Sequence, residues 1–104
     1  MTTAQFTVLY RWRLKPGAEQ RFRDAWESVS RELLSRGSLG SRLHRADDGT
    51  FVSYAQWPSS DARQRAFEQP TDCGEAHRVM ADSIAESFDE IILVLLVDLL
   101  VAEQ

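Results

Sequence analysis

Apolar residues alternate with polar ones near the start of the chain and then recur with helical spacing. In residues 6–14 every second residue is apolar or aromatic, which is typical of a strand with one buried face. Lys-Pro-Gly at residues 15–17 interrupts this pattern, and apolar residues then return every three or four positions in residues 18–34. This predicts an amphipathic helix that ends near Gly37, because glycine readily takes the left-handed conformation that closes a helix.

Two short apolar runs follow, residues 39–46 and 51–57, separated by Asp-Asp-Gly-Thr. Asp-Gly between two such runs predicts a β-hairpin. Pro58 closes the second run, and Ser59 or Ser60 is expected to cap a helix that ends before Pro70.

The last third of the chain predicts one more helix and a final apolar segment. The helix is expected from about Gly74 to Phe88, because its apolar residues fall on one stripe. Residues 91–101 could prolong that helix or form a separate strand. Their β-branched residues, and the break offered by Asp89 and Glu90, favour the strand.

Strand, helix, hairpin, helices and strand form the α+β, ferredoxin-like βαββαβ order, which gives a four-stranded antiparallel sheet with helices on one face. Residues 91–101 are apolar on both faces, so the sheet needs a cover on its second face as well. A second copy of the sheet is the simplest cover, and the chain is therefore expected to form a homodimer, a dimeric α/β barrel. Asp98 is then expected to pair with an arginine or to lie at the rim.

Composition limits the possible functions. With 104 residues and 43% hydrophobic content, residues 1–104 are expected to form one domain with a modest core. The net charge is −4 and the arginines are scattered, so no nucleic acid is expected as a partner, although arginine beside aromatic residues could also bind single strands by stacking. Cys73 is the single cysteine, which excludes an internal disulfide and makes a reducing, cytoplasmic location the default expectation.

Neither end of the chain predicts membrane targeting. Residues 1–5 lack the charged and apolar regions of a secretory signal. Residues 91–102 are apolar but too short to span a bilayer, which takes about 20 residues, and they carry Asp98. We therefore expect buried protein rather than a lipid-facing segment, and no membrane partner.

Several of these segments resemble the antibiotic biosynthesis monooxygenase family over about residues 6–100. The resemblance is carried by Lys-Pro-Gly-Ala-Glu at residues 15–19, Phe22 and Trp26 on the first helix, Trp-Pro-Ser-Ser at residues 57–60, and Ala-Phe at residues 66–67. It implies a dimeric α/β barrel with a pocket between helices and sheet in each subunit. Family members include oxygenases that oxidise phenolic or anthrone-like polyketides without metal or flavin, and related enzymes that degrade haem.

The haem-degrading branch matches this chain poorly. Its haem-ligating histidine corresponds to His77, but its first-strand asparagine falls at Tyr10 and its helix tryptophan at Ala66. Haem degradation is therefore the less favoured of the activities that the resemblance implies.

An oxygenase without a cofactor needs an electron-rich substrate, a base to deprotonate it, and an apolar pocket that excludes water. His77 is the first candidate base, because imidazole exchanges a proton near neutral pH, although it could also be a core histidine hydrogen-bonded to the backbone. Tyr10 and Tyr54 are further catalytic candidates as hydroxyl donors. Substrate-binding candidates are aromatic or apolar side chains that could also be ordinary core residues: Trp12, Trp26, Phe67 and Met80.

Other chemistries lack a basis in the sequence. The two histidines, His44 and His77, have no ligand-like spacing with carboxylates, and the glycines form no nucleotide-binding array, so no metal and no cofactor is expected. His44 is expected on the sheet face, where it could serve the dimer interface. Two function classes remain open: a cofactor-independent monooxygenase of an aromatic, quinol or polyketide-type small molecule, and a non-catalytic ligand-binding or interaction dimer of the same fold.

Overall fold

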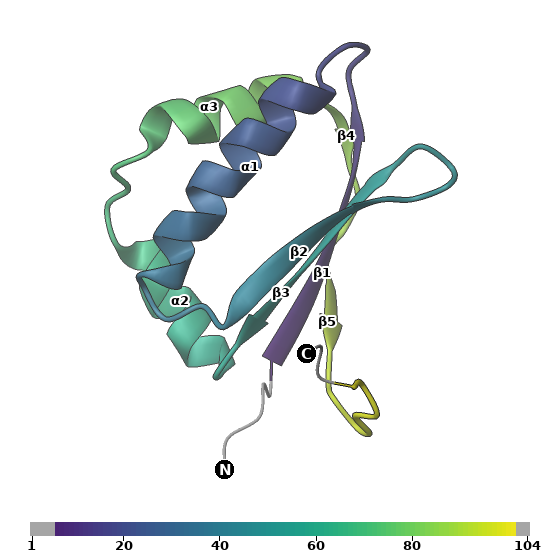
Figure 1. Cartoon of the computed structure of the whole chain (residues 1–104). Helices are drawn as coiled ribbons and strands as arrows, with labels where there is room; N and C mark the ends of the chain where they lie inside the picture. The colour runs from purple at the N-terminus through teal and green to yellow at the C-terminus, as the bar shows by residue number, and fades with distance from the viewer. Residues whose placement is uncertain (1–5, 102–104) are drawn as a thin grey trace.

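The computed structural model describes residues 6–101 and arranges them as a layer of three helices against one face of an antiparallel sheet (Figure 1). The elements in chain order are β1 (Phe6–Leu14), α1 (Glu19–Leu34), β2 (Gly40–Arg45), β3 (Phe51–Trp57), α2 (Ser60–Glu68), α3 (Gly74–Ser83), β4 (Ile84–Ser87) and β5 (Ile91–Leu93). The strand order is β2-β3-β1-β4, with β5 also paired to β1. This confirms the predicted α+β, ferredoxin-like arrangement.

The first helix and the hairpin match the sequence prediction closely. The loop between β2 and β3 turns at Gly49, whose φ of 90° lies in the left-handed region that glycine tolerates best. Ser59, rather than Ser60, caps α2, because its hydroxyl oxygen accepts the backbone N–H of Ala62 at 3.1 Å. The helix ends before Pro70, as expected.

The prediction of a helix from Gly74 to Phe88 was wrong for its last five residues. The helix α3 ends at Ser83, and Ile84, with φ −92° and ψ 125°, begins the strand β4. This strand pairs with the edge of β1 that β3 leaves free, and so gives its backbone groups hydrogen-bond partners. Arg13 lies opposite Glu86, and the two side chains form an ion pair at 3.5 Å. Pairing along that edge outweighs the helical stripe of the local sequence.

The predicted final strand, residues 91–101, was also wrong in length. Only Ile91–Leu93 pair with β1, and Leu93 lies opposite Thr7, one residue from the start of that strand. Beyond Leu93 the described part of β1 offers only one further residue, so pairing stops and residues 94–101 have no regular structure. The predicted four-stranded sheet is instead five-stranded, because β4 and β5 share one edge of β1.

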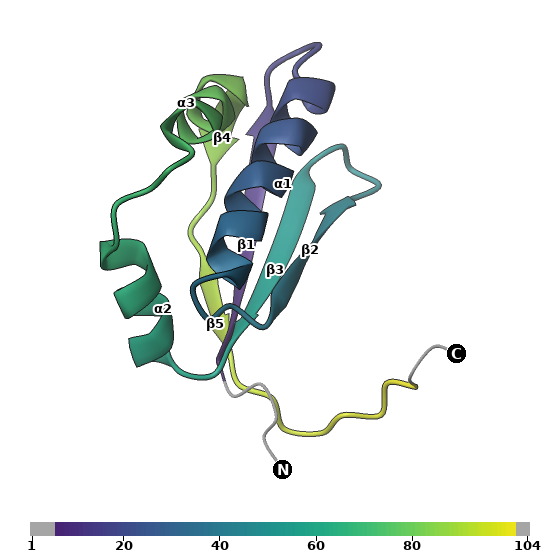
Figure 2. The same cartoon turned by 60° about the vertical axis from the view of Figure 1, so that its left-hand side comes forward.

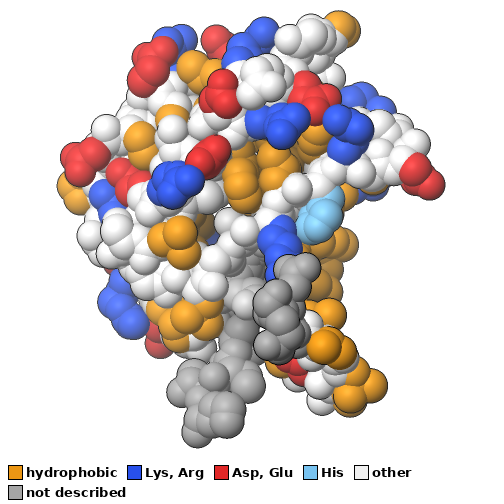
Figure 3. Space-filling model, viewed as in Figure 1, with side chains coloured by type: hydrophobic (Ala, Val, Ile, Leu, Met, Phe, Trp, Pro, Cys, Tyr) orange, Lys and Arg blue, Asp and Glu red, His pale blue; other side chains and the backbone are white. Residues whose placement is uncertain are grey.

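Residues 94–101 run away from the sheet and expose their apolar side chains (Figures 2 and 3). The Asp98 carboxylate lies in this exposed segment and accepts the backbone N–H of Leu100 at 2.9 Å. Its pairing with an arginine in a dimer stays a prediction. Among residues 6–101, no helix is both long enough and apolar enough to cross a membrane.

The two faces of the sheet differ in their surroundings. Val8 and its partner Ala55 are buried beneath the helices, and so is Trp57 at the end of β3. The ring of Phe22 on α1 packs edge-on against Trp12 with centroids 5.3 Å apart, which joins the helix layer to β1. The opposite face carries the alternate residues of each strand, and no other part of residues 6–101 forms a second layer over it (Figure 1).

Candidate functional site

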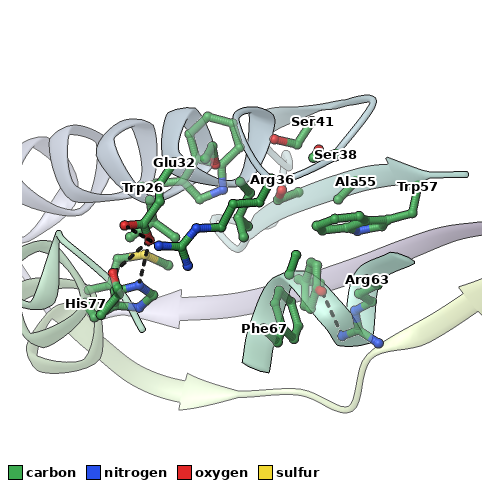
Figure 4. A pocket seen from close by; sticks show the side chains of 18 of the residues that line it. Trp26, Glu32, Arg36, Ser38, Ser41, Ala55, Trp57, Arg63, Phe67 and His77 are labelled. Atoms are coloured by element: carbon green, nitrogen blue, oxygen red, sulfur yellow. Dashed lines mark hydrogen bonds and ion pairs between the residues drawn. The ribbon is translucent and has the colours of Figure 1, made fainter. Parts of the chain in front are cut away.

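A cavity of about 520 Å³ lies between the helix layer and the sheet (Figure 4). Its size falls within the range of small-molecule sites, which is roughly 300–1,000 Å³. Its lining comes from β1, β3, all three helices and the turn after α1, and it includes Tyr10, Trp12, Trp26, Glu32, Arg36, Trp57, Arg63, Phe67, His77 and Met80. The substrate-binding candidates Trp12, Trp26, Phe67 and Met80 all line this cavity.

Aromatic side chains form much of the wall. The rings of Tyr10 and Trp12 are stacked along β1 with centroids 5.9 Å apart and an interplanar angle of 5°. The rings of Trp57 and Phe67 meet edge to face at 5.9 Å and 87°. Flat, apolar surfaces of this kind suit a planar aromatic ligand.

Tyr10 and Arg63 form one polar end of the cavity. The Arg63 Nη2 donates to the Tyr10 hydroxyl oxygen and to Glu90 Oε2, both at 2.9 Å. The hydroxyl oxygen of Tyr10 therefore acts as acceptor toward arginine, which leaves its own proton available for a ligand. Burial raises the pKa of Tyr10, an effect that the neighbouring Arg63 only partly offsets, so the hydroxyl stays protonated at neutral pH.

Aromatic rings hold the Arg63 guanidinium in place. Its central carbon lies 5.0 Å from the centroid of the Phe67 ring, 5.8 Å from that of Tyr10 and 6.0 Å from that of Phe6. The pKa of Arg63 is raised, because the hydrogen bond to Glu90 and the contacts with Tyr10 outweigh the opposing effect of burial. This end of the cavity thus carries a fixed cation with an ordered hydroxyl beside it.

Glu32 and His77 form the second polar end, where α1 faces α3. The Nε2 of His77 lies 3.9 Å from Glu32 Oε1, and the two side chains point toward one another (Figure 4). His77 is 48% exposed, so it borders both the cavity and solvent rather than lying in the core. The alternative of a core histidine was therefore wrong, and the role of His77 as a base stays a prediction.

Glu32 is fixed by more hydrogen bonds than His77. Its Oε1 accepts the Thr71 hydroxyl and its Oε2 accepts the backbone N–H of Asp72, both at 2.7 Å. These hydrogen bonds, led by that from Thr71, lower the pKa of Glu32 to about 2. Arg36, in the turn that follows α1, lies 3.4 Å from Oε2, and only 12–13% of either side chain is exposed.

Cys73 lies close to Glu32 and His77. It immediately precedes α3, and its sulfur, one carboxylate oxygen of Glu32 and one ring nitrogen of His77 all lie within 4.8 Å of one another. Within residues 6–101 this is the single group of three side chains with metal-ligand chemistry at such a spacing.

Tyr54 does not line the cavity. It lies on β3 between Ser53 and Ala55, both buried toward the helices, and therefore points to the opposite face of the sheet. There its ring stacks on His44 at 6.4 Å. The structure therefore does not bring Tyr54 together with the other catalytic candidates, Tyr10 and His77, and it leaves His44 on the sheet face, as expected.

Sequence reasoning missed Glu32, Arg36 and Arg63. Glu32 and Arg63 lie on helices and Arg36 in the turn after α1, all among other charged residues, and nothing in the spacing of the charges distinguishes them from the solvated ones. Arg63 is placed in the site by contacts with Glu90 and Tyr10, which are 27 and 53 residues away in the sequence.

A comparison with models of protein families identifies one family. Residues 5–79 match the sequence model for antibiotic biosynthesis monooxygenases. No curated protein matched the chain.

Solved structures of low sequence identity share the fold. SnoaB from Streptomyces nogalater, described as a cofactor-independent oxygenase, has a TM-score of 0.77 and 20% identity, covering 93% of this chain and 98% of SnoaB. A candidate antibiotic biosynthesis monooxygenase from Bordetella bronchiseptica has a TM-score of 0.74 and 18% identity over 91% of this chain and 100% of its own. Rv0793 from Mycobacterium tuberculosis has a TM-score of 0.74 and 15% identity, covering 92% of this chain and 99% of Rv0793.

Proposed function

This chain belongs to the antibiotic biosynthesis monooxygenase family, and from that premise we propose that it is a cofactor-independent monooxygenase of an aromatic, quinol or polyketide-type small molecule. The observation that carries the proposal is the aromatic cavity with a hydrogen-bonding group at each end, Tyr10 with Arg63 at one and His77 with Glu32 at the other. The description of SnoaB as a cofactor-independent oxygenase supports the same reaction class.

The two ends of the cavity have different tasks in this reaction. The free proton of the Tyr10 hydroxyl donates to a keto or phenolic oxygen of the substrate, and the Arg63 cation stabilises negative charge that develops there. His77 accepts the proton from the reacting carbon, and the Glu32 carboxylate stabilises the imidazolium that results. Trp12, Trp26 and Phe67 hold the ring system between them.

The substrate supplies all the electrons. For an anthrone-type CH₂ group, removal of one proton gives a carbanion that transfers an electron to dioxygen, and the two radicals combine to a peroxide. Loss of water from the peroxide gives a ring carbonyl, so that CH₂ and O₂ become C=O and H₂O. The protein contributes position, proton transfer and the exclusion of water from the apolar part of the cavity.

The proposal includes a homodimer through the open face of the sheet. Leu9, Ile91 and Leu93 share that face, and Ile91 and Leu93 are 51% and 41% exposed in the single chain. Residues 94–101 add further exposed apolar side chains beside it (Figure 3). An apolar surface of this extent is typical of a protein interface, and a second copy of the sheet is the partner that the fold suggests.

The alternative function is a dimer that binds a small aromatic ligand without oxidising it. The same cavity supports this alternative, because aromatic walls and two polar ends favour binding in either case. Haem degradation is less well supported, since Tyr10 and Ala66 stand where that branch has asparagine and tryptophan.

Oxygen uptake with a panel of anthrones and hydroquinones tests the proposal. The native chain is expected to consume oxygen faster than a substrate-only blank for at least one member, and for an anthrone one carbonyl should form for each O₂ consumed. In parallel, quenching of tryptophan fluorescence reports binding of each compound. Binding without uptake above the blank across the panel would favour the ligand-binding alternative, and neither uptake nor binding would contradict both functions for these ligand classes.

A further inference from the structure

Three chemically different metal ligands meet where α1 faces α3. Cys73 and His77 are four residues apart at the start of α3, and Glu32 comes from the facing turn of α1. One sulfur, one ring nitrogen and one carboxylate oxygen from these residues lie within 4.8 Å of one another. Figure 4 shows the side chains of Glu32 and His77 directed at the same point.

We infer that Glu32, Cys73 and His77 form a binding site for a divalent zinc-type cation at the end of the cavity. This inference goes beyond the proposed oxygenase function, which uses no metal. Thiolate, imidazole and carboxylate are the three side-chain ligands that Zn²⁺ takes in proteins, and three protein ligands with a fourth open position are typical of its reactive sites.

The distances suit a small rearrangement. Metal–ligand bonds of about 2.0–2.3 Å in a tetrahedral site separate the ligand atoms by roughly 3.3–3.8 Å. The His77 Nε2 and Glu32 Oε1 are 3.9 Å apart, already close to that spacing. Rotation of the Cys73 and His77 side chains, which are partly exposed, is enough to close the remaining gap.

Glu32 is arranged as a metal ligand requires. The Thr71 hydroxyl and the Asp72 N–H fix the carboxylate, and they are the outer hydrogen bonds that commonly orient a ligating group. Arg36 lies beside Oε2, whereas Oε1 faces His77. Oε1 is therefore the oxygen that would coordinate the cation, while Oε2 keeps its contacts with Arg36 and Asp72.

Metal binding and proton abstraction then compete for His77. Binding replaces the thiol proton of Cys73 by the metal and occupies a ring nitrogen of the imidazole. The proposed site borders the cavity, since Glu32, Thr71 and His77 line it. A bound cation thus blocks the base of the proposed oxygenase and gives the cavity a Lewis acid in its place.

Titration of the native chain with Co²⁺, a spectroscopic substitute for Zn²⁺, tests the site without any activity measurement. We expect a thiolate-to-cobalt charge-transfer band in the near ultraviolet that saturates at one Co²⁺ per chain and is abolished by added Zn²⁺. Because Cys73 is the single cysteine, this band can arise from no other residue. Absence of the band at excess Co²⁺, or saturation at half an equivalent per chain, would overturn the inference.

Matched variants separate the ligands from their surroundings. Cys73→Ser is expected to abolish the band, and His77→Gln and Glu32→Gln to weaken Co²⁺ binding at least about tenfold. His44→Gln, on the opposite face of the sheet, is expected to leave the titration unchanged. Circular dichroism establishes that each variant is folded. A His77→Gln variant that is folded and binds Co²⁺ as tightly as the native chain would contradict the assignment.

Because a bound cation blocks His77, oxygen uptake is measured on protein freed of metal with a chelator, and the cobalt titration is carried out separately. Oxygen uptake without a cobalt band would leave the oxygenase and remove the metal site. A cobalt band without uptake by the metal-free protein would leave the metal site and remove the oxygenase.

Discussion

The guanidinium of Arg63 lies 2.9 Å from the hydroxyl oxygen of Tyr10, although 53 residues separate the two in sequence. This contact ties α2 to β1 across the cavity and orders a hydroxyl whose proton is free for a ligand. Removing that hydroxyl is the smallest change that tests its role.

Tyr10→Phe should weaken the binding of a phenolic or keto ligand about two- to tenfold, the effect of one hydrogen bond worth about 0.5–1.5 kcal/mol. The aromatic wall stays in place, and Arg63 keeps its pairing with Glu90. Fluorescence titration measures the affinity. Tyr54→Phe is the matched control on the opposite face and should bind as the native chain does; equal losses in both variants would contradict the placement of the ligand.

Glu32 should make the stability of the native chain depend on acid pH. Its pKa falls from 4.5 to about 2 on folding, so its ionised form stabilises the folded state above about pH 4.5. That contribution is lost as the pH falls toward 2. Glu32→Gln should therefore lower the Tm at pH 7 more than at pH 3, as measured by circular dichroism, and a pH-independent difference would argue against the hydrogen bonds from Thr71 and Asp72.

Leu93→Asp should weaken self-association at least about tenfold, because it places a charge on the apolar face that we propose the second copy covers. Analytical ultracentrifugation over a range of concentrations measures the effect. Leu34→Asp is the control, since Leu34 is also exposed, at 52% against 41% for Leu93, but lies on α1 in the helix layer. A native chain that is monomeric throughout would refute the dimer.

Ser59→Ala should lower the free energy of unfolding by about 1 kcal/mol, through loss of the cap that accepts the Ala62 N–H. Ser60→Ala, one residue further into α2, should have little effect. Urea denaturation of both variants measures the difference, and the reverse order of stabilities would contradict the observed cap.

Local pattern was sufficient for β1, α1, the hairpin and α2, because in each of them the apolar period and the turn residues agree. It failed after Ser83, where a helical stripe continued through Ile84 and Phe88 while the free edge of β1 required a strand. Strand pairing depends on what is left unpaired elsewhere in the sheet, and local periodicity carries no information about this.

In the candidate site too, some residues could be predicted from local pattern and others could not. His77 and the aromatic lining could be found from residue type and period, because a stripe or an alternating strand indicates which side faces inward. Residue type alone could not tell which of Tyr10 and Tyr54 faces the cavity. The pairing of β1 with β3 shows that they lie on opposite faces, because Tyr10 lies opposite Ser53 rather than Tyr54. The hydrogen bonds that Arg63 forms with Tyr10, and Glu32 with Thr71, join residues distant in sequence, and local pattern gives no sign of them.

The most direct test of the proposed chemistry is oxygen consumption by the native chain, His77→Ala and His44→Ala with the panel compound that the native chain oxidises fastest. We predict that His77→Ala reduces the rate above the blank at least about 100-fold, the usual contribution of a general base, while His44→Ala retains the native rate. A folded His77→Ala variant that consumes oxygen as fast as the native chain would contradict the account.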